Sequence, residues 1–353
     1  MSEDIYRKLA QHLDDLPGGF PSTESGVELR ILRRLFTPEE AELALHLTLF
    51  PEESEIVAGR AGIDQEEATQ RLDKMAKKGL IYSIERDGKL PKYRASQYMV
   101  GIWEFHVNSL DLDLIRDTNE YFPALFREAW KVPQLRTIPV GQSLTPQHEV
   151  LPYEQAEELV RAQDKIAVAP CICRREHTMV EKGCDRPKET CLVFGSGADY
   201  YVRNGLGRSI DLDETLKILN LAEEAGLVLQ PSNAKKAAFI CLCCGCCCQV
   251  LKNIKRYPRP ASLVSSPFVA AVNLDTCEGC GDCVDRCQME ALELGDNTVA
   301  LDLDRCIGCG LCVTTCPTES LSMVRKPESE QPEVPKNMIE ASLKLAKARE
   351  KIG

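Results

Sequence analysis

Two stretches decide the fold of the C-terminal part of this chain: TCEGCGDCVDRCQ at residues 276–288 and RCIGCGLCVTTCP at residues 305–317. Each contains three cysteines separated from one another by two residues, and a fourth after three more. Three thiols at this spacing allow one loop to wrap three corners of an iron–sulfur cube. Zinc is the alternative for any group of thiols, and the repeated order of these eight cysteines argues against it. The two stretches therefore predict two [4Fe–4S] clusters.

The fourth thiol of each stretch is expected to point away from its own loop and toward the other cluster. The predicted ligands of one cluster are Cys277, Cys280, Cys283 and Cys316. The predicted ligands of the other cluster are Cys306, Cys309, Cys312 and Cys287. Glycines between the cysteines leave backbone N–H groups free to approach the sulfurs.

Residues 268–326 closely resemble the bacterial-type two-cluster ferredoxins. The intervening segments fit this resemblance: residues 292–294 are expected to pair with residues 298–301 around a turn, and residues 269–272 can pair with residues 321–324. One departure is Gln288, which stands where these ferredoxins have a proline after the first stretch. The resemblance implies a domain that moves electrons.

Ten further cysteines lie upstream, and we expect them to bind metal. They are Cys171, Cys173, Cys184, Cys191, Cys241, Cys243, Cys244, Cys246, Cys247 and Cys248. Cys241, Cys244 and Cys247 repeat the two-residue spacing, so we predict one or two further iron–sulfur clusters here. Zinc remains an alternative, because C-x-C with distant partners also suits a tetrahedral site. Redox-active or merely buried thiols are the other alternative.

Five basic residues surround the first upstream cysteines, namely Arg174, Arg175, Lys182, Arg186 and Lys188. They are able to offset the negative charge of a thiolate-bound cluster, although surface residues on loops need no special role. We expect His177 to be an ordinary loop or core histidine rather than a ligand. The layout of this segment resembles multi-cluster iron–sulfur proteins of anaerobic microbes, which implies metal binding and an anaerobic redox context but no substrate.

The N-terminal part is predicted to be helical, followed by a two-stranded ribbon. Thr37-Pro38-Glu39-Glu40 is typical of a capped helix start. Residues 64–79 predict a second helix with one apolar face, and Asp87-Gly88 predicts a hairpin turn. The order helix, turn, helix and ribbon over residues 27–97 resembles a winged helix.

The predicted fold class is therefore multidomain α+β. We expect a winged-helix-like domain at residues 1–104, a helical connector at 105–160, a cysteine-rich α/β iron–sulfur domain at 161–262, a two-[4Fe–4S] ferredoxin domain at 263–326, and a linker with a C-terminal helix at 327–353. Trp103 and Trp130 are expected to be packing anchors. The terminal helix has a partial apolar face, with which it either packs on its own chain or binds a partner.

Composition narrows the function. The 353 residues carry a formal net charge of −11, which argues against a broad nucleic-acid footprint. The start, MSEDIYRKLA, has no apolar signal core, and clustered thiols without a signal indicate metal rather than disulfides. No stretch is apolar enough to predict a membrane span. We therefore expect a cytoplasmic protein.

The function that we predict is electron transfer, within or to an anaerobic oxidoreductase complex. No flavin, nicotinamide, molybdopterin or haem motif is apparent, so two-electron chemistry would need a partner with a flavin- or metal-containing catalytic subunit. Residues 268–326 contain ten acidic and four basic side chains, which predicts a basic docking surface on that partner. An enzyme whose active site is a middle cluster with an open iron position is less favoured, because the sequence reveals no substrate pocket.

A redox-sensing DNA-binding regulator is the alternative function, in which the winged helix would bind DNA. The start of its second helix argues against it, since Asp64, Glu66 and Glu67 would face phosphates. Lys74, Lys77 and Lys78 keep the alternative open. DNA binding is therefore not expected.

Overall fold

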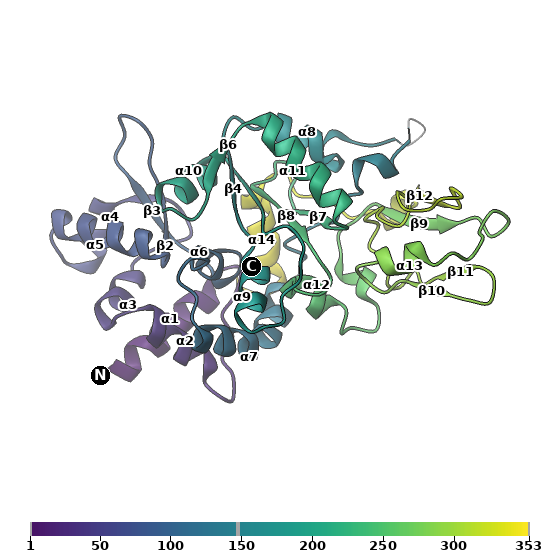
Figure 1. The fold of residues 1–353 in the computed structure, drawn as a ribbon. Coiled ribbons are helices and arrows are strands. Elements are labelled where there is room, and N and C mark those ends of the chain that lie inside the picture. Colours follow the sequence, from purple (N-terminus) through teal and green to yellow (C-terminus); the bar gives the residue numbers. More distant parts are fainter. Residues whose placement is uncertain (1, 146–148, 352–353) are drawn as a thin grey trace. The chain divides into compact units, whose positions relative to one another are not determined.

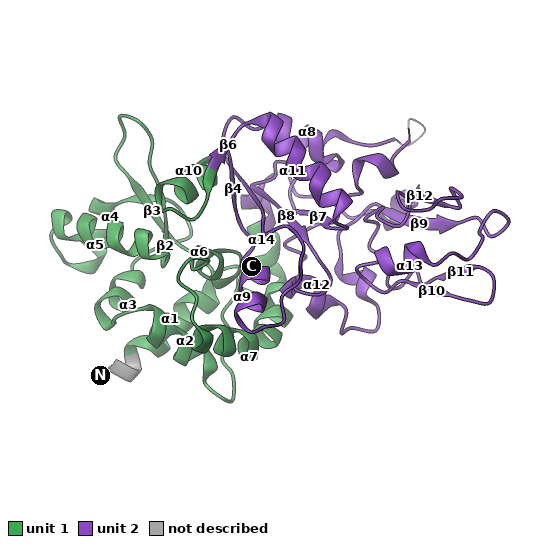
Figure 2. Ribbon diagram, in the orientation of Figure 1, with its two compact units in different colours: residues 1–132, 196–208, 342–353 green, residues 133–195, 209–341 purple. Residues whose placement is uncertain are grey.

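The computed structural model describes residues 2–145 and 149–351, and the chain divides into two compact units (Figure 2). Unit 1 comprises residues 1–132, 196–208 and 342–353, and unit 2 comprises residues 133–195 and 209–341. All eighteen cysteines fall within unit 2. The predicted connector at 105–160 is shared between the two units, and the division into five predicted segments stays a prediction.

Unit 1 begins with a helical segment and a small sheet (Figure 1). Its elements up to residue 95 are α1 (Ser2–Asp15), α2 (Val27–Leu35), α3 (Pro38–Ala44), β1 (Glu52–Glu53), α4 (Ser54–Ala61), α5 (Gln65–Lys78), β2 (Ile81–Ile84) and β3 (Lys92–Ala95). The three strands form an antiparallel sheet in the order β1-β3-β2. The predicted hairpin between β2 and β3 is confirmed.

Both predicted helix starts in this segment are confirmed. Thr37 caps α3 by accepting a hydrogen bond from the Glu40 N–H, and the Glu40 carboxylate accepts one from the Thr37 N–H. Asp64 caps α5 through its carboxylate, which accepts the N–H groups of Glu66 and Glu67. The predicted apolar face of α5 is buried, as one residue per helical turn must be when a helix packs on a core. Its buried residues are Ala68, Leu72, Met75 and Ala76.

The remainder of unit 1 packs around aromatic residues. Its elements are a distorted turn at Tyr98–Ile102, α6 (Trp103–Phe105), α7 (Leu112–Ala129), α10 (Ser196–Arg203) and the end of α14 (Met338–Ala348). Trp103 and Trp130 are buried, as predicted. The hydroxyl of Tyr200 on α10 lies 2.8 Å from the Ala76 carbonyl oxygen and 2.9 Å from that of Ile81, which attaches α10 to the N-terminal segment.

The chain end packs on unit 1 through Arg349. Its side chain is 2% exposed and donates to the carbonyl oxygens of Asp14 and Leu16. It also forms an ion pair of 2.7 Å with the Asp14 carboxylate. Of the two roles considered for the terminal helix, packing on its own chain is therefore the one observed at this end. Ile339 and Leu343 remain exposed.

Unit 2 is built on a five-stranded sheet in the order β6-β4-β5-β8-β7 (Figure 1). The strands are β4 (Ile166–Pro170), β5 (Glu189–Phe194), β6 (Arg208–Ile210), β7 (Val228–Pro231) and β8 (Phe239–Cys243). Its helices are α8 (Ala156–Arg161), α9 (Ile172–Met179), α11 (Leu212–Glu224) and α12 (Gln249–Ile254), with short 3-10 turns at Gly141–Ser143, Pro152–Glu154 and Pro260–Leu263. β4 reads IAVAP and is almost wholly buried, which is expected of a strand inside a sheet.

The C-terminal part of unit 2 consists of short paired strands around the cysteine loops. Its elements are β9 (Phe268–Val272), α13 (Asp282–Arg286), β10 (Leu292–Leu294), β11 (Val299–Leu301), β12 (Leu321–Arg325) and a 3-10 turn at Glu328–Glu330. β10 pairs with β11 and β9 pairs with β12, both antiparallel, with Leu321 opposite Val272. Both predicted pairings are confirmed.

Within residues 2–145 and 149–351, no helix is both long enough and apolar enough to span a membrane.

Candidate metal centre

The loops that carry the eight C-terminal cysteines depend on glycines with left-handed backbone conformation. Gly279 and Gly308 have φ of 64° and 70°. A Cβ at Gly308 would overlap the Phe268 carbonyl oxygen, and one at Gly279 would lie 2.7 Å from that of Asn297. Only glycine satisfies both the φ angle and the close approach, so the loops can fold tightly around a central group.

One set of four thiols gathers around Cys283. Burial raises the pKa of Cys283, and the charges that add to this increase are those of Cys280, Cys316 and Cys277. These four are the cysteines that the sequence assigns to one cluster. They come from both stretches, since Cys316 belongs to the second. Cys283 is buried, whereas Cys280 is exposed.

A second set of four thiols lines one enclosed cavity. Cys287, Cys306, Cys309 and Cys312 all contribute to its wall, together with apolar side chains that include Met289, Ile307 and Leu311. Burial raises the pKa of Cys309 to about 12. Four thiols at one apolar cavity fit a cluster that binds thiolates and excludes water. The ligand assignment itself stays a prediction.

Backbone N–H groups from outside the glycine-rich loops reach three of the eight sulfurs. Ala270 N lies 3.4 Å from Cys306 Sγ. Ala291 N lies 3.3 Å from Cys287 Sγ, and Ser320 N lies 3.3 Å from Cys316 Sγ. Such hydrogen bonds stabilise negative charge on sulfur and so favour the reduced form of a bound cluster.

The fold and the thiol sets together define a ferredoxin-like iron–sulfur domain within a larger protein, and comparison with known proteins agrees. Residues 276–329 match the family described as the 4Fe–4S dicluster domain. Over 33 residues the chain is 52% identical to a "Probable ferredoxin" of Methanosarcina thermophila. This match covers 9% of the chain and 57% of that ferredoxin, so it informs on the domain and not on the whole protein.

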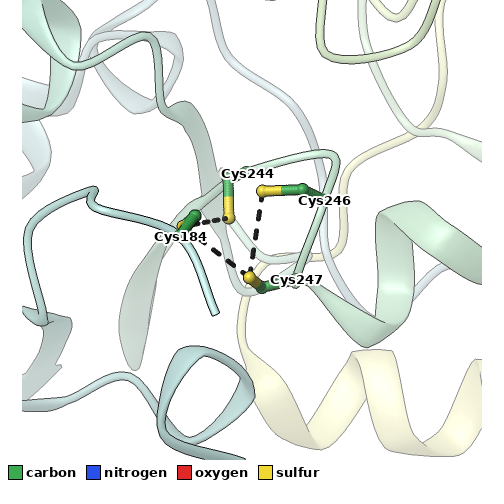
Figure 3. A group of neighbouring side chains, drawn as sticks. All are labelled: Cys184, Cys244, Cys246 and Cys247. Atoms are coloured by element: carbon green, nitrogen blue, oxygen red, sulfur yellow. Dashed lines mark hydrogen bonds between the residues drawn. The ribbon is translucent and has the colours of Figure 1, made fainter. Parts of the chain in front are cut away.

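The ten upstream thiols separate into two sets in the structure. Four of them form a thiol quartet, which consists of Cys184, Cys244, Cys246 and Cys247 (Figure 3). Cys184 lies in the loop between α9 and β5, and the other three lie in the turn between β8 and α12. Burial opposes ionisation of Cys184, but the Arg186 N–H and the neighbouring thiols lower its pKa to about 7.

The other six thiols form a thiol sextet on the inner strands β5 and β8 of the five-stranded sheet and near the starts of α9 and α12. Its members are Cys171, Cys173, Cys191, Cys241, Cys243 and Cys248. Cys191 on β5 is directly opposite Cys241 on β8, so both project from one face. Cys243 projects from the same face, because side chains two residues apart on a strand do so. Cys171 and Cys248 precede α9 and α12.

The sextet thiols contact one another in a row. Hydrogen bonds from Cys191 and Cys243 lower the pKa of Cys241 well below its usual value. At the other end of the row, hydrogen bonds from Cys173 and Cys243 lower the pKa of Cys248 in the same way. Thiolates adjacent to one another in a half-buried site are the donors that a metal–sulfur centre needs. The sextet therefore brings together six thiols that are able to bind metal.

A buried arginine lies between the two thiol sets. Arg174 on α9 is 2% exposed and donates to the carbonyl oxygens of Pro187 (2.9 Å) and Leu242 (2.7 Å) and to the Thr190 hydroxyl. Burial alone would lower its pKa, yet nearby charge on Cys171, Cys244 and Cys243 raises it. Among the described residues no carboxylate pairs with it.

From the sequence, Arg174 and four other basic residues needed no special role. The structure shows that Arg174 differs from the others in its burial and its contacts. Thiolates at these positions, as in a metal–sulfur centre, would compensate its charge. Arg186 also contacts a thiol, with its Nη1 3.4 Å from Cys246 Sγ. Arg175, Lys182 and Lys188 are exposed.

His177 is a core histidine, as expected. Its Nδ1 lies 2.8 Å from the Cys173 carbonyl oxygen, and its Nε2 lies 2.8 Å from Lys252 Nζ. Both ring nitrogens therefore have protein partners.

Sequence reasoning missed the contact that joins the ferredoxin-like domain to the cysteine-rich turn. The Gln288 side-chain carbonyl accepts a hydrogen bond of 2.8 Å from the Gly245 N–H. Any Cβ at Gly245 would overlap the Gln288 backbone carbonyl oxygen. The available signal was the departure from the ferredoxin pattern at position 288, where proline has no side-chain amide.

Proposed function

We propose that this protein transfers electrons through a series of iron–sulfur centres, as a subunit that relays electrons within or to an oxidoreductase complex. In this proposal Cys277, Cys280, Cys283 and Cys316 hold one [4Fe–4S] cluster and Cys306, Cys309, Cys312 and Cys287 hold another. The sextet holds a third iron–sulfur centre. The ferredoxin-like domain and the thiol sextet support this reading.

The observation that carries the relay is the hydrogen bond between Gly245 and Gln288. Gln288 follows Cys287, a proposed cluster ligand, and Gly245 lies in the turn that leads to Cys248 of the sextet. Arg286 strengthens the contact by donating to the carbonyl oxygens of Glu223 and Glu224 at the end of α11. A fixed contact of this kind keeps two redox centres at a constant separation.

The proposed docking side for a redox partner is the loop around Cys280. This cysteine is exposed, and so are Glu278, Asp282 and Asp285 beside it. None of these three acids forms an ion pair within the described part of the chain. A basic surface on a partner would be attracted to this loop, which raises the association rate and orients the encounter.

In this proposal the substrate chemistry belongs to a flavin- or metal-containing partner. Iron–sulfur clusters of this type carry single electrons, so conversion of a two-electron substrate needs another cofactor. We assign residues 27–97 of unit 1, as a winged-helix-like module, to protein docking.

A redox-sensing DNA-binding regulator is the second candidate. The observation that favours it is the element order α2, α3, β1, α4, α5, β2, β3 with the sheet order β1-β3-β2, which resembles a winged helix. Lys74 and Lys77 on α5 are exposed and would be available to phosphates. The acidic first turn of α5 opposes it.

The test of the proposed function is a count of iron and acid-labile sulfide in the protein purified without oxygen. Two clusters of the ferredoxin domain account for about eight irons, so a higher count is expected. Cys280→Ser and Cys309→Ser should each perturb one ferredoxin cluster in the electron paramagnetic resonance spectrum and leave the others unchanged. A count of eight irons, with no metal bound to the sextet, would contradict the third centre. If the spectra of both variants were the same as that of the unchanged protein, the ligand assignment would be wrong.

A further inference from the structure

The four sulfurs of the thiol quartet lie close to one another (Figure 3). Cys184 Sγ lies 4.0 Å from Cys244 Sγ and 3.7 Å from Cys247 Sγ. Cys246 Sγ lies 3.8 Å from Cys247 Sγ. All four sulfurs lie within 4.8 Å of one another, so they surround a single point.

This spacing is that of a tetrahedron around one metal ion. With zinc–sulfur bonds of about 2.3 Å, the edges of a sulfur tetrahedron measure roughly 3.8 Å. A [4Fe–4S] cluster cannot produce such edges, because each of its thiolates binds a different iron at a different corner of the cube. The four sulfurs are therefore too close together for a cube.

The ferredoxin-like domain provides an internal standard for the wider spacing. Its eight cysteines lie in a domain whose family binds two [4Fe–4S] clusters. Within residues 2–145 and 149–351, no three of these eight thiols lie as close together as those of the quartet. The sextet contains no such group either, so the chain holds two classes of thiol spacing.

The burial and the charges around the quartet also suit a single metal ion more than a redox centre that exchanges electrons at the surface. Cys244 and Cys247 are buried, Cys184 is half-buried and Cys246 is exposed. Arg186 Nη1 lies 3.4 Å from Cys246 Sγ, and the charge of buried Arg174 acts on Cys244. Four thiolates around a divalent ion carry two net negative charges, and two guanidinium groups oppose them.

We propose that Cys184, Cys244, Cys246 and Cys247 bind one tetrahedral metal ion, of the Zn²⁺ or Fe²⁺ class, and not an iron–sulfur cluster. The ion joins the loop after α9 to the turn after β8, two segments that are 60 residues apart between Cys184 and Cys244. It thereby holds the turn whose Gly245 N–H binds Gln288. Its role is to hold the surface on which the ferredoxin-like domain sits.

The first experiment uses the full-length protein purified without oxygen. X-ray absorption at the zinc and iron edges should detect one ion with four sulfur ligands at about 2.3 Å and no iron neighbour. This measurement needs no variant. If zinc is absent and all iron has iron neighbours, the proposal is wrong.

The second experiment is the double variant Cys184→Ser/Cys246→Ser, with Cys191→Ser in the sextet as its matched control. The double variant should lose about one equivalent of zinc or iron and no acid-labile sulfide. The control should keep that equivalent. If the double variant lost about four irons together with their sulfide, the quartet would hold a cube. If the zinc content of the double variant were unchanged, the metal would be adventitious. Either result overturns the proposal. The spectrum of the ferredoxin clusters reports whether each variant is folded, and neither outcome bears on whether electrons pass through those clusters.

Discussion

Arg174 illustrates how a single residue reports on the chemistry around it. A guanidinium that is 2% exposed and has no carboxylate partner among the described residues would be costly to bury next to neutral thiols. Neighbouring thiols that bind a metal as thiolates would compensate its charge. The guanidinium charge would in turn act on the centre that those thiolates bind.

We predict that Arg174→Gln lowers the reduction potential of the sextet centre. Reduction adds negative charge, which the guanidinium stabilises, so its loss disfavours the reduced form by on the order of 60 mV, a tenfold change for one electron. Redox titration followed by electron paramagnetic resonance measures this shift. Arg174→Lys is the control, since it keeps the charge, and it should recover most of the potential. An unchanged potential in Arg174→Gln would place the sextet centre away from this residue.

At the scale of elements, the turn between β8 and α12 combines three tasks within a few residues. It supplies thiols to the quartet and the sextet, and its Gly245 meets Gln288 of the ferredoxin-like domain. A side chain at position 245 has no room, because the Gln288 backbone carbonyl is too close. The turn is therefore the element through which the two parts of unit 2 contact each other.

We predict that Gly245→Ala weakens this contact and slows electron transfer between the sextet centre and the ferredoxin clusters. The overlap should cost about 1–3 kcal/mol, relieved by displacement of the ferredoxin-like domain. Rapid-freeze measurements of cluster reduction after mixing with a reductant would measure the rate. Gly141→Ala, at a glycine of the same unit whose Cβ would meet nothing within 4 Å, should behave like the unchanged protein. Equal rates in the two variants would show that the contact is not used.

The charge pattern of α5 leads to a second prediction at this scale, that the protein does not bind DNA sequence-selectively. Glu66 and Glu67 lie exposed in its first turn, and Lys78 is paired with Glu40 at 2.7 Å. The remaining exposed lysines are Lys74 and Lys77. A mobility-shift assay at about 0.15 M salt tests this. A selective shift that is lost in Lys74→Glu/Lys77→Glu would favour the regulator instead.

At the scale of the whole molecule, all eighteen cysteines lie in unit 2, and unit 1 contains none. Unit 1 consists of helices around a small sheet. Electron transfer alone does not require such a unit. We therefore predict that the protein works in a complex. Anoxic purification from its native cell, followed by mass spectrometry, should recover a flavin- or metal-containing oxidoreductase with it. Recovery of a monomer that exchanges electrons with soluble carriers alone would contradict this.

The sequence by itself determined the elements whose signals are local. The cysteine spacing and glycines of residues 276–317 identified the two-cluster domain, because a cluster loop is specified by neighbouring residues. The capped start of α3, the apolar face of α5 and the pairing of β9 with β12 were predicted for the same reason. Their hydrogen bonds and apolar faces depend on residues a few positions apart or on a single pairing.

Only the tertiary structure decided how the ten upstream thiols are divided. Spacing placed Cys241, Cys244 and Cys247 in one repeated pattern, yet the strand β8 ends at Cys243 and the chain then turns. Cys241 and Cys243 follow the strand and face Cys191, whereas Cys244 and Cys247 follow the turn and meet Cys184. Which thiols converge depends on strand register and on a loop 60 residues away, and neither is encoded in the spacing of one short stretch.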